Sequence, residues 1–271
     1  MNQIITKIIR EITPPILVRL YRNSSRKKVF SGNYKTWDDA RKQSIGYESD
    51  TILNKVKDAL LKVKNGEAVY ERDSVLFDKV RYSWPLLAWL LWVASREGNR
   101  LRLVDFGGSL GSTYFQNRGL MAHLIELNWN IVEQATFVEC GKHYFEDEHL
   151  KFYNRLDECM KAQRSDIILL SSVIQYLEKP YDLLKEIIEQ RFKYILIDRT
   201  SFLHEGDDRI TVQTVPEEIY SASYPSWFFN QNKFVDFFSE KYELIADFET
   251  NDQADIPSVF KGYFFRLRNN A

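Results

Sequence analysis

The spacing of apolar residues changes near residue 100 and divides the chain into two regions. Before this point apolar side chains recur at helical spacing, for example at Ile52, Val56 and Leu60. Beyond it, short apolar runs alternate with helical stretches. We therefore predict an N-terminal helical region over residues 1–97, packed on a second region over residues 98–271.

Five apolar runs in the second region are predicted strands, and the helical stretches between them indicate a parallel sheet covered on both faces. They read LRLVDF, WNIVEQ, LKFYN, DIILLSS and KYILIDRT. The closing runs KYELIADFET and FKGYFFRLRN have only a polar loop between them, so we expect them to pair antiparallel at one end of the sheet. This α/β arrangement is the outline of the seven-stranded, Rossmann-like sheet of class I methyltransferases.

A glycine-rich turn follows the first of these strands. The spacing is D-x-G-G-x-x-G, with Asp105, Gly107, Gly108 and Gly111 around Ser109, whereas dinucleotide sites use G-x-G-x-x-G. Glycines let the backbone approach a ligand, and the following helix points N–H groups at it. A carboxylate at the strand end repels a pyrophosphate but attracts an ammonium group. The turn therefore predicts a cationic ligand, with a simple tight turn as the alternative.

An acidic residue at the end of the second strand can accept hydrogen bonds from ribose hydroxyls. Glu133, followed by Gln134, occupies this place. Glu139 competes with it, but residues 136–139 fit a capping box that opens the next helix, so we prefer Glu133. After the fourth strand, Ser171, Ser172 and Gln175 are further candidate cofactor contacts, with a satisfied strand-end turn as the alternative.

The segment after the fifth strand concentrates charged residues and is the best candidate for an acceptor lid. We predict catalytic roles among Asp198, Arg199, His204, Asp208 and Arg209, although a strand-end ion pair and a solvated histidine are the plainer interpretations. A following aromatic run could stack on a sugar ring or simply pack the core. It contains Tyr224, Trp227, Phe228 and Phe229.

Composition and charge exclude several classes of protein. The formal net charge is −1, which gives no electrostatic case for a nucleic-acid partner. The apolar run over residues 84–94 is too short for a bilayer span, and two cysteines without a dense framework suit a reducing compartment, so we expect a cytoplasmic protein. Residues 1–28 carry seven Lys/Arg against one Glu. They fit either a helix at the inner membrane surface or, preferably, a helix packed on the body.

Four residues superficially resemble a zinc site in the pattern C-x₂-H-x₅-H-x₉-C. Their segment would contain a helix, a strand and the start of another helix, which would scatter the side chains, so we predict no metal site. They are Cys140, His143, His149 and Cys159.

The motifs together resemble a family of bacterial class I S-adenosylmethionine-dependent methyltransferases often encoded among genes for surface polysaccharides. The resemblance covers nearly the whole chain from about residue 30, through runs such as ERDSVLFDKVRYSWPLLAWLLW, LRLVDFGGSLGSTYFQNR, SDIILLSSVIQYLEKP, YILIDRT and DRITVQTVP. It implies S-adenosylmethionine as cofactor and a small-molecule or glycan acceptor, methylated on oxygen. An NAD-dependent sugar oxidoreductase and a non-catalytic binding module at the membrane remain the alternatives.

Overall fold

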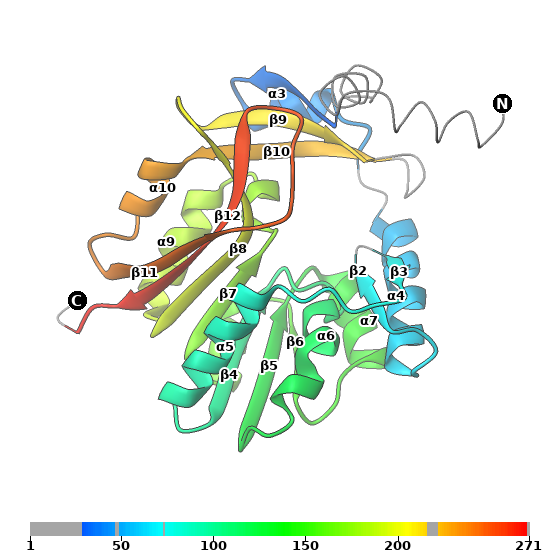
Figure 1. Ribbon diagram of the computed structural model, residues 1–271. Helices are drawn as coiled ribbons and strands as arrows, with labels where there is room; N and C mark the ends of the chain where they lie inside the picture. The colour runs from blue at the N-terminus through cyan, green and yellow to red at the C-terminus, as the bar shows by residue number, and fades with distance from the viewer. Residues whose placement is uncertain (1–28, 47–48, 73, 216–221, 270–271) are drawn as a thin grey trace, which may run out of the picture.

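A seven-stranded sheet forms the centre of the computed structural model, which describes residues 29–46, 49–72, 74–215 and 222–269. In spatial order the strands are β6 (Leu150–Tyr153), β5 (Glu126–Val132), β4 (Arg100–Phe106), β7 (Ile167–Ser171), β8 (Tyr194–Leu203), β12 (Ser258–Leu267) and β11 (Tyr242–Glu249) (Figure 1). β4 to β8 pair in parallel, and β12 is antiparallel to both β8 and β11. The predicted fold of five parallel strands and an antiparallel hairpin is confirmed.

The central strands are apolar on both faces because helices cover both. One buried cluster joins Leu103 and Leu169 to α4 (Ser49–Lys64), α5 (Trp84–Arg96), α6 (Ser112–Met121) and α7 (Ala135–Tyr144). The other cluster joins Val104 and Ile168 to α8 (Leu156–Ala162), α9 (Pro180–Gln190) and α10 (Gln231–Asp236). Burial of this apolar area supplies the main favourable term in folding.

A second, antiparallel sheet continues from the end of β8, in the segment predicted to form an acceptor lid. β7 ends at Ser171, and β10 (Ser223–Asn230) then pairs with the last two residues of β8. β9 (Arg209–Thr214) and β1 (Phe30–Tyr34) complete this extension, which α3 (Trp37–Lys42) accompanies (Figure 1). Within this segment β9 is a regular strand, and Ile210 and Val212 bury their side chains in one small apolar cluster.

The described part of residues 1–97 contains three strands as well as the expected helices. A short hairpin of β2 (Tyr70–Arg72) and β3 (Val75–Phe77) lies between α4 and α5, and β1 pairs with β9. Residues 1–28, including the predicted basic helix, lie outside the described residues. Among the helices that are described, none combines the length and apolarity that a bilayer crossing requires.

Two glycines provide a test of the packing around β12. A Cβ at Gly262 would lie 2.7 Å from the carbonyl oxygen of Ile197 and 2.2 Å from the Phe248 ring, whereas a Cβ at Gly119 in α6 would meet nothing within 4 Å. We expect Gly262→Ala to destabilise the fold by about 1–3 kcal/mol through overpacking. Gly119→Ala, the matched control, should stabilise the helix by about 0.5–1 kcal/mol. Urea unfolding measures both, and equal effects would contradict the packing described for β12.

Candidate functional site

The glycine turn between β4 and α6 is folded in a way that requires small residues. Gly107 has φ +73° and Gly111 has φ +101°, and the turn also holds Ser109 at φ +55°. The amide of Gly107 donates to the carbonyl of Val132, which ties the turn to the end of β5. A Cβ at Gly107 would lie 2.4 Å from Cγ2 of Val173, so the turn after β7 packs directly against this glycine.

Asp105 lies beneath the glycine turn and is almost completely buried, with 2% of its surface exposed. A Cβ at Gly108 would stand 2.6 Å from its Cγ, so only glycine lets the turn settle over the carboxyl group. The indole Nε1 of Trp129 donates to Oδ2 at 3.0 Å. Burial raises the pKa of Asp105 to about 7, the Trp129 hydrogen bond lowers it, and the nearby Glu133 adds to the rise.

Glu133 reaches the same turn from the end of β5. Its carboxylate accepts the amide of Gln134 at 2.7 Å and a backbone hydrogen bond from Ser109, and burial raises its pKa. The structure thus connects both predicted acids with the predicted turn. The capping box predicted over residues 136–139 was wrong: α7 begins at Ala135 after the N-cap Gln134, without a side-chain cap, and Glu139 is exposed on the helix.

The carboxyl end of β7 and the middle of β8 hold a second buried carboxylate, that of Asp198. Ser171 is the register partner of Asp198, and its Oγ donates to Asp198 Oδ2 at 3.1 Å. Asp198 is 1% exposed, and burial raises its pKa to about 6 although Arg199 and Ser171 lower it. Asp105 and Asp198 point to the same face of the sheet, because the residues two positions before them, Leu103 and Leu196, belong to one buried cluster.

A β-bulge follows immediately in β8. Lys261 pairs with Thr200 and Tyr263 with Ile197, so the single Gly262 opposes both Asp198 and Arg199. Arg199 takes φ +52°, a left-handed conformation that costs a non-glycine residue free energy. Bulges re-aim side chains and are frequent next to functional sites.

The guanidinium of Arg199 forms a bidentate ion pair with Asp252, which lies in the loop between β11 and β12. Arg199 Nε lies 3.0 Å from Oδ2, and Arg199 Nη2 lies 3.1 Å from Oδ1. Burial opposes ionisation of Asp252, but Arg199, with a smaller contribution from Arg72 of β2, lowers its pKa overall. Sequence reasoning missed Asp252, since a polar hairpin loop carries no signal of the strand that it will meet.

Gln175 closes the network from the short 3₁₀ helix η1 (Ile174–Tyr176). Its Nε2 donates to Ser172 Oγ at 3.3 Å and to the carbonyl oxygen of Arg199 at 3.0 Å. The amide of Ser172 donates in turn to the carbonyl oxygen of Asp198. The structure therefore brings Ser171, Ser172 and Gln175 together with Asp198 and Arg199, next to the glycine turn that Val173 contacts.

The three other predicted catalytic residues make different contacts. Asp208 accepts hydrogen bonds from Tyr181 Oη at 2.9 Å and from the backbone amide of Asn230 at 2.7 Å. Arg209 donates to the carbonyl of Gly32 in β1 at 3.0 Å, and His204 is exposed in the turn between β8 and β9. These contacts hold the antiparallel extension to its neighbours.

The aromatic run proposed to stack on a sugar ring is largely occupied by packing. Phe228 and Phe229 are fully buried. Trp227 stacks against both Trp37 and Phe229, and its Nε1 donates to the carbonyl of Leu177. Tyr224 is half-buried and meets Tyr176 edge to face.

Glu71 of β2 is a further buried carboxylate near the turn. Its Oε1 accepts the amide of Ser74 at 2.7 Å, and its Oε2 accepts Ser112 Oγ at 2.5 Å. Ser112 begins α6 directly after the glycine turn. Glu71 thereby fastens the β2–β3 hairpin to the start of that helix.

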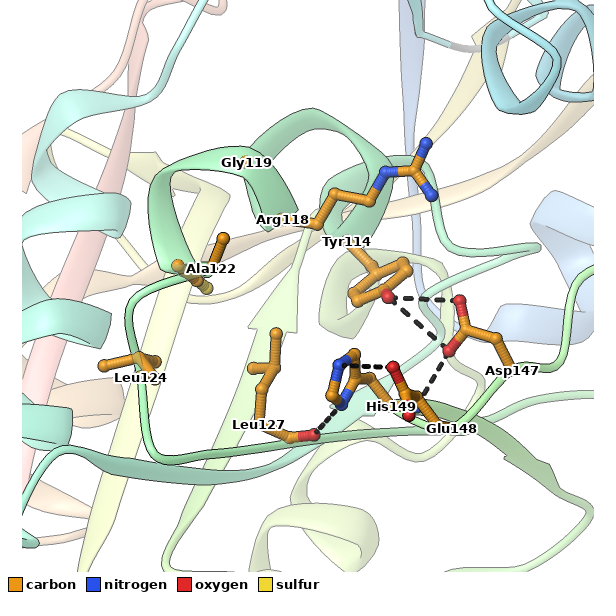
Figure 2. Close-up of a pocket in the computed structure, with 10 residues that line it drawn as sticks. Tyr114, Arg118, Gly119, Ala122, Leu124, Leu127, Asp147, Glu148 and His149 are labelled. Carbon is orange, nitrogen blue, oxygen red and sulfur yellow. Dashed lines mark hydrogen bonds and ion pairs between the residues drawn. The ribbon is translucent and has the colours of Figure 1, made fainter.

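Over the described residues, no group of three or more His, Cys, Asp or Glu is placed to hold a metal ion. An open pocket lies at the opposite end of the sheet, between α6 and the starts of β5 and β6 (Figure 2). There Tyr114 donates to Asp147 at 3.2 Å, and His149 Nδ1 lies 3.0 Å from the carbonyl of Leu127. None of the residues that line this pocket belongs to the glycine turn.

No protein-family model matches the chain, and no curated protein matches its sequence. Three solved structures illustrate its similarities to known folds. The N-terminal domain of EvdMO1, solved with S-adenosylhomocysteine and D-fucose, is 11% identical with a TM-score of 0.49, over 82% of this chain and 98% of that one. 1,6-Didemethyltoxoflavin-N1-methyltransferase of Burkholderia thailandensis is 11% identical with a TM-score of 0.45, over 82% and 92%. Magnesium protoporphyrin IX methyltransferase of Synechocystis PCC 6803 is 10% identical with a TM-score of 0.44, over 97% and 96%. We assign the fold from the strand order rather than from these alignments.

The raised pKa of Asp105 predicts a pH-dependent stability difference. A carboxyl group whose folded-state pKa rises from 3.8 to about 7 retains a proton that the unfolded chain has lost, so the fold loses stability as pH rises through that window. Asp105→Asn removes this loss and still offers an oxygen to Trp129. In chemical denaturation we expect the variant to match the wild type near pH 4 and to become the more stable protein towards pH 8. A difference that is constant with pH would contradict the assignment.

Proposed function

We propose that the protein is an S-adenosylmethionine-dependent methyltransferase that methylates a hydroxyl of a carbohydrate or related precursor. One observation carries this proposal: two acidic side chains, Asp105 and Glu133, meet a glycine turn at the carboxyl ends of neighbouring parallel strands. In open α/β sheets, ligands bind outside these carboxyl ends. The order of the strands reverses at β4, because β5 lies on one side of β4 and β7 lies on the other.

The chemistry of these side chains fits this cofactor. Asp105 and Glu133 are carboxylates whose ionised forms are disfavoured by burial, so a ligand that supplies positive charge or hydrogen-bond donors is stabilising there. S-adenosylmethionine offers an ammonium group to one acid and ribose hydroxyls to the other. When bound, it supplies an electrophilic methyl group on a sulfonium. The turn residues Gly107, Gly108, Ser109 and Gly111, with Gln134 after β5, belong to the same proposed site.

The alternatives fit the same residues less well. A pyrophosphate would face the buried acid at Asp105, which disfavours the NAD-dependent oxidoreductase. A non-catalytic module would bind cofactor without turnover, so methyl transfer separates it from the enzyme.

On the acceptor side we favour Asp198 and Arg199 over His204, Asp208 and Arg209. The first two share the network of Ser171, Ser172 and Gln175 beside the glycine turn. Their proposed task is to orient the acceptor and to take its proton, because alignment of two reactants supplies much of the rate in such displacements.

The proposed setting is the cytoplasm, on precursors of surface polysaccharide, with peripheral contact to the inner membrane through residues 1–28. The basic composition of that segment supports membrane contact. Full-length protein should co-sediment with anionic vesicles at low salt and be released at high salt, since screening weakens the attraction. Protein that stays in the supernatant at low salt contradicts the contact.

Calorimetry with S-adenosylhomocysteine tests the cofactor assignment. We expect binding by the wild type, no comparable binding of NAD, and a loss of about 1–3 kcal/mol in Asp105→Asn and in Glu133→Gln, because each loses a charge-assisted partner. Glu126→Gln is the matched control: Glu126 pairs with Arg102 at the opposite end of β5. Preference for NAD, or an equal loss in the control, would remove the proposal.

A further inference from the structure

Two buried oxygen atoms beside the carboxyl end of β7 lack hydrogen-bond partners within the described part of the chain. Among the described residues, neither Asp198 Oδ1 nor Gln175 Oε1 has a partner with hydrogen-bond geometry, although the backbone amide of Arg199 helps to lower the pKa of Asp198, and the two side chains are 1% and 0% exposed. A buried polar atom that is left without a hydrogen bond is destabilising. Two such atoms in one network require an explanation.

The hydrogen bonds of these two side chains identify which of their atoms lack partners. The Gln175 amide cannot be reversed, because a carbonyl oxygen in place of Nε2 would face the carbonyl oxygen of Arg199, which only accepts. Asp198 keeps Oδ2 on the Ser171 hydroxyl. Both remaining atoms are therefore acceptors, and a group that satisfies them must bring N–H or O–H donors.

The backbone next to Asp198 is in a strained conformation. The bulge inserts one extra residue of β8 opposite Gly262, and Arg199 is held at φ +52°. The ion pair with Asp252 holds Arg199, and the Arg199 carbonyl in turn holds Gln175. Strain of this kind persists where surrounding structure over-determines it and is concentrated at functional sites.

We propose that Asp198 Oδ1 and Gln175 Oε1 receive the reacting group of a neutral acceptor, a hydroxyl or amine that donates hydrogen bonds, and that Asp198 is the base that takes its proton. This inference rests on the proposed methyltransferase function and deepens it. The acceptor's oxygen or nitrogen forms a bond to the methyl carbon as the bond from carbon to sulfur breaks. The electron pair of that bond returns to sulfur, and the acceptor's proton passes to Asp198 Oδ1 and then to solvent.

The electrostatics agree with this role. Burial raises the pKa of Asp198 to about 6, Arg199 and Ser171 lower it, and Asp252 raises it. A base is most effective when its pKa lies near the working pH. Gln175, which cannot take a proton, orients the reacting group.

The test compares Asp198→Asn with the control variant Asp166→Asn. Asp166 is a buried aspartate just before β7, and it forms ion pairs with Arg102 and Lys193. S-adenosylhomocysteine affinity should stay within about twofold in Asp198→Asn, since the residue faces the acceptor. Wild type that does not bind S-adenosylhomocysteine overturns the proposed function itself. Normal binding by the wild type with a large loss in Asp198→Asn overturns only the present inference.

Thermal melts at pH 8 give a readout that needs no acceptor. Removing a buried, under-satisfied charge should raise the melting temperature of Asp198→Asn by a few degrees, on the scale of about 2–4 °C per kcal/mol. Asp166→Asn should melt lower, because two cations lose a partner. If Asp198→Asn melts as low as this control, the carboxylate is structural and only an ordered water occupies the site.

Transfer of labelled methyl groups is measured with S-adenosylmethionine and four probes: water, glycerol, methyl α-glucopyranoside and ethanolamine. We expect wild-type transfer to at least one probe, falling as pH drops below about 6, and a decrease of about 10²–10⁴-fold in Asp198→Asn. Gln175→Leu should lower transfer while leaving the pH profile in place. No wild-type transfer, or undiminished transfer by Asp198→Asn, overturns the inference.

Discussion

The candidate site depends on one constraint: the carboxyl group of Asp105, at the carboxyl edge of the sheet, is buried with no positive charge among the groups that shift its pKa. Asp105 receives a single neutral donor, the Trp129 indole, while the glycine turn closes over it. Burial of an ionised group is unfavourable unless it is paired. The fold therefore holds this carboxylate at a cost in stability, which a cationic ligand would offset.

The same sheet explains why the site lies where it does. Parallel strands with helices on both faces leave only their ends for polar chemistry. Asp105 is the last residue but one of β4, Glu133 follows β5, and Asp198 of β8 lies opposite Ser171, the residue at which β7 ends. The antiparallel extension takes over the pairing of β8 there, so that a strand that begins in the central sheet ends in the second one.

Local patterns sufficed to predict the central sheet and the glycine turn. The alternation of a strand and the residues at its end are local features of the sequence. Asp105 and Glu133 could therefore be assigned to the ends of their strands. The Asp198–Arg199 bulge could not, because it depends on register with β12 and on Gly262, which is distant in sequence. The ion pair between Arg199 and Asp252 could not be predicted either, because these two residues are also distant in sequence. β9 was missed although its alternating Ile210 and Val212 were a usable signal.

Proton release on ligand binding tests the central claim most directly. If a cationic group binds against Asp105, whose pKa burial raises to about 7, binding near pH 6.5 must displace a proton. Calorimetric titration with S-adenosylhomocysteine in two buffers of different ionisation enthalpy should then give different heats, and Asp105→Asn should reduce the difference. Equal heats in both buffers for the wild type, with binding intact, would contradict the account of Asp105 as the buried partner of a cationic ligand.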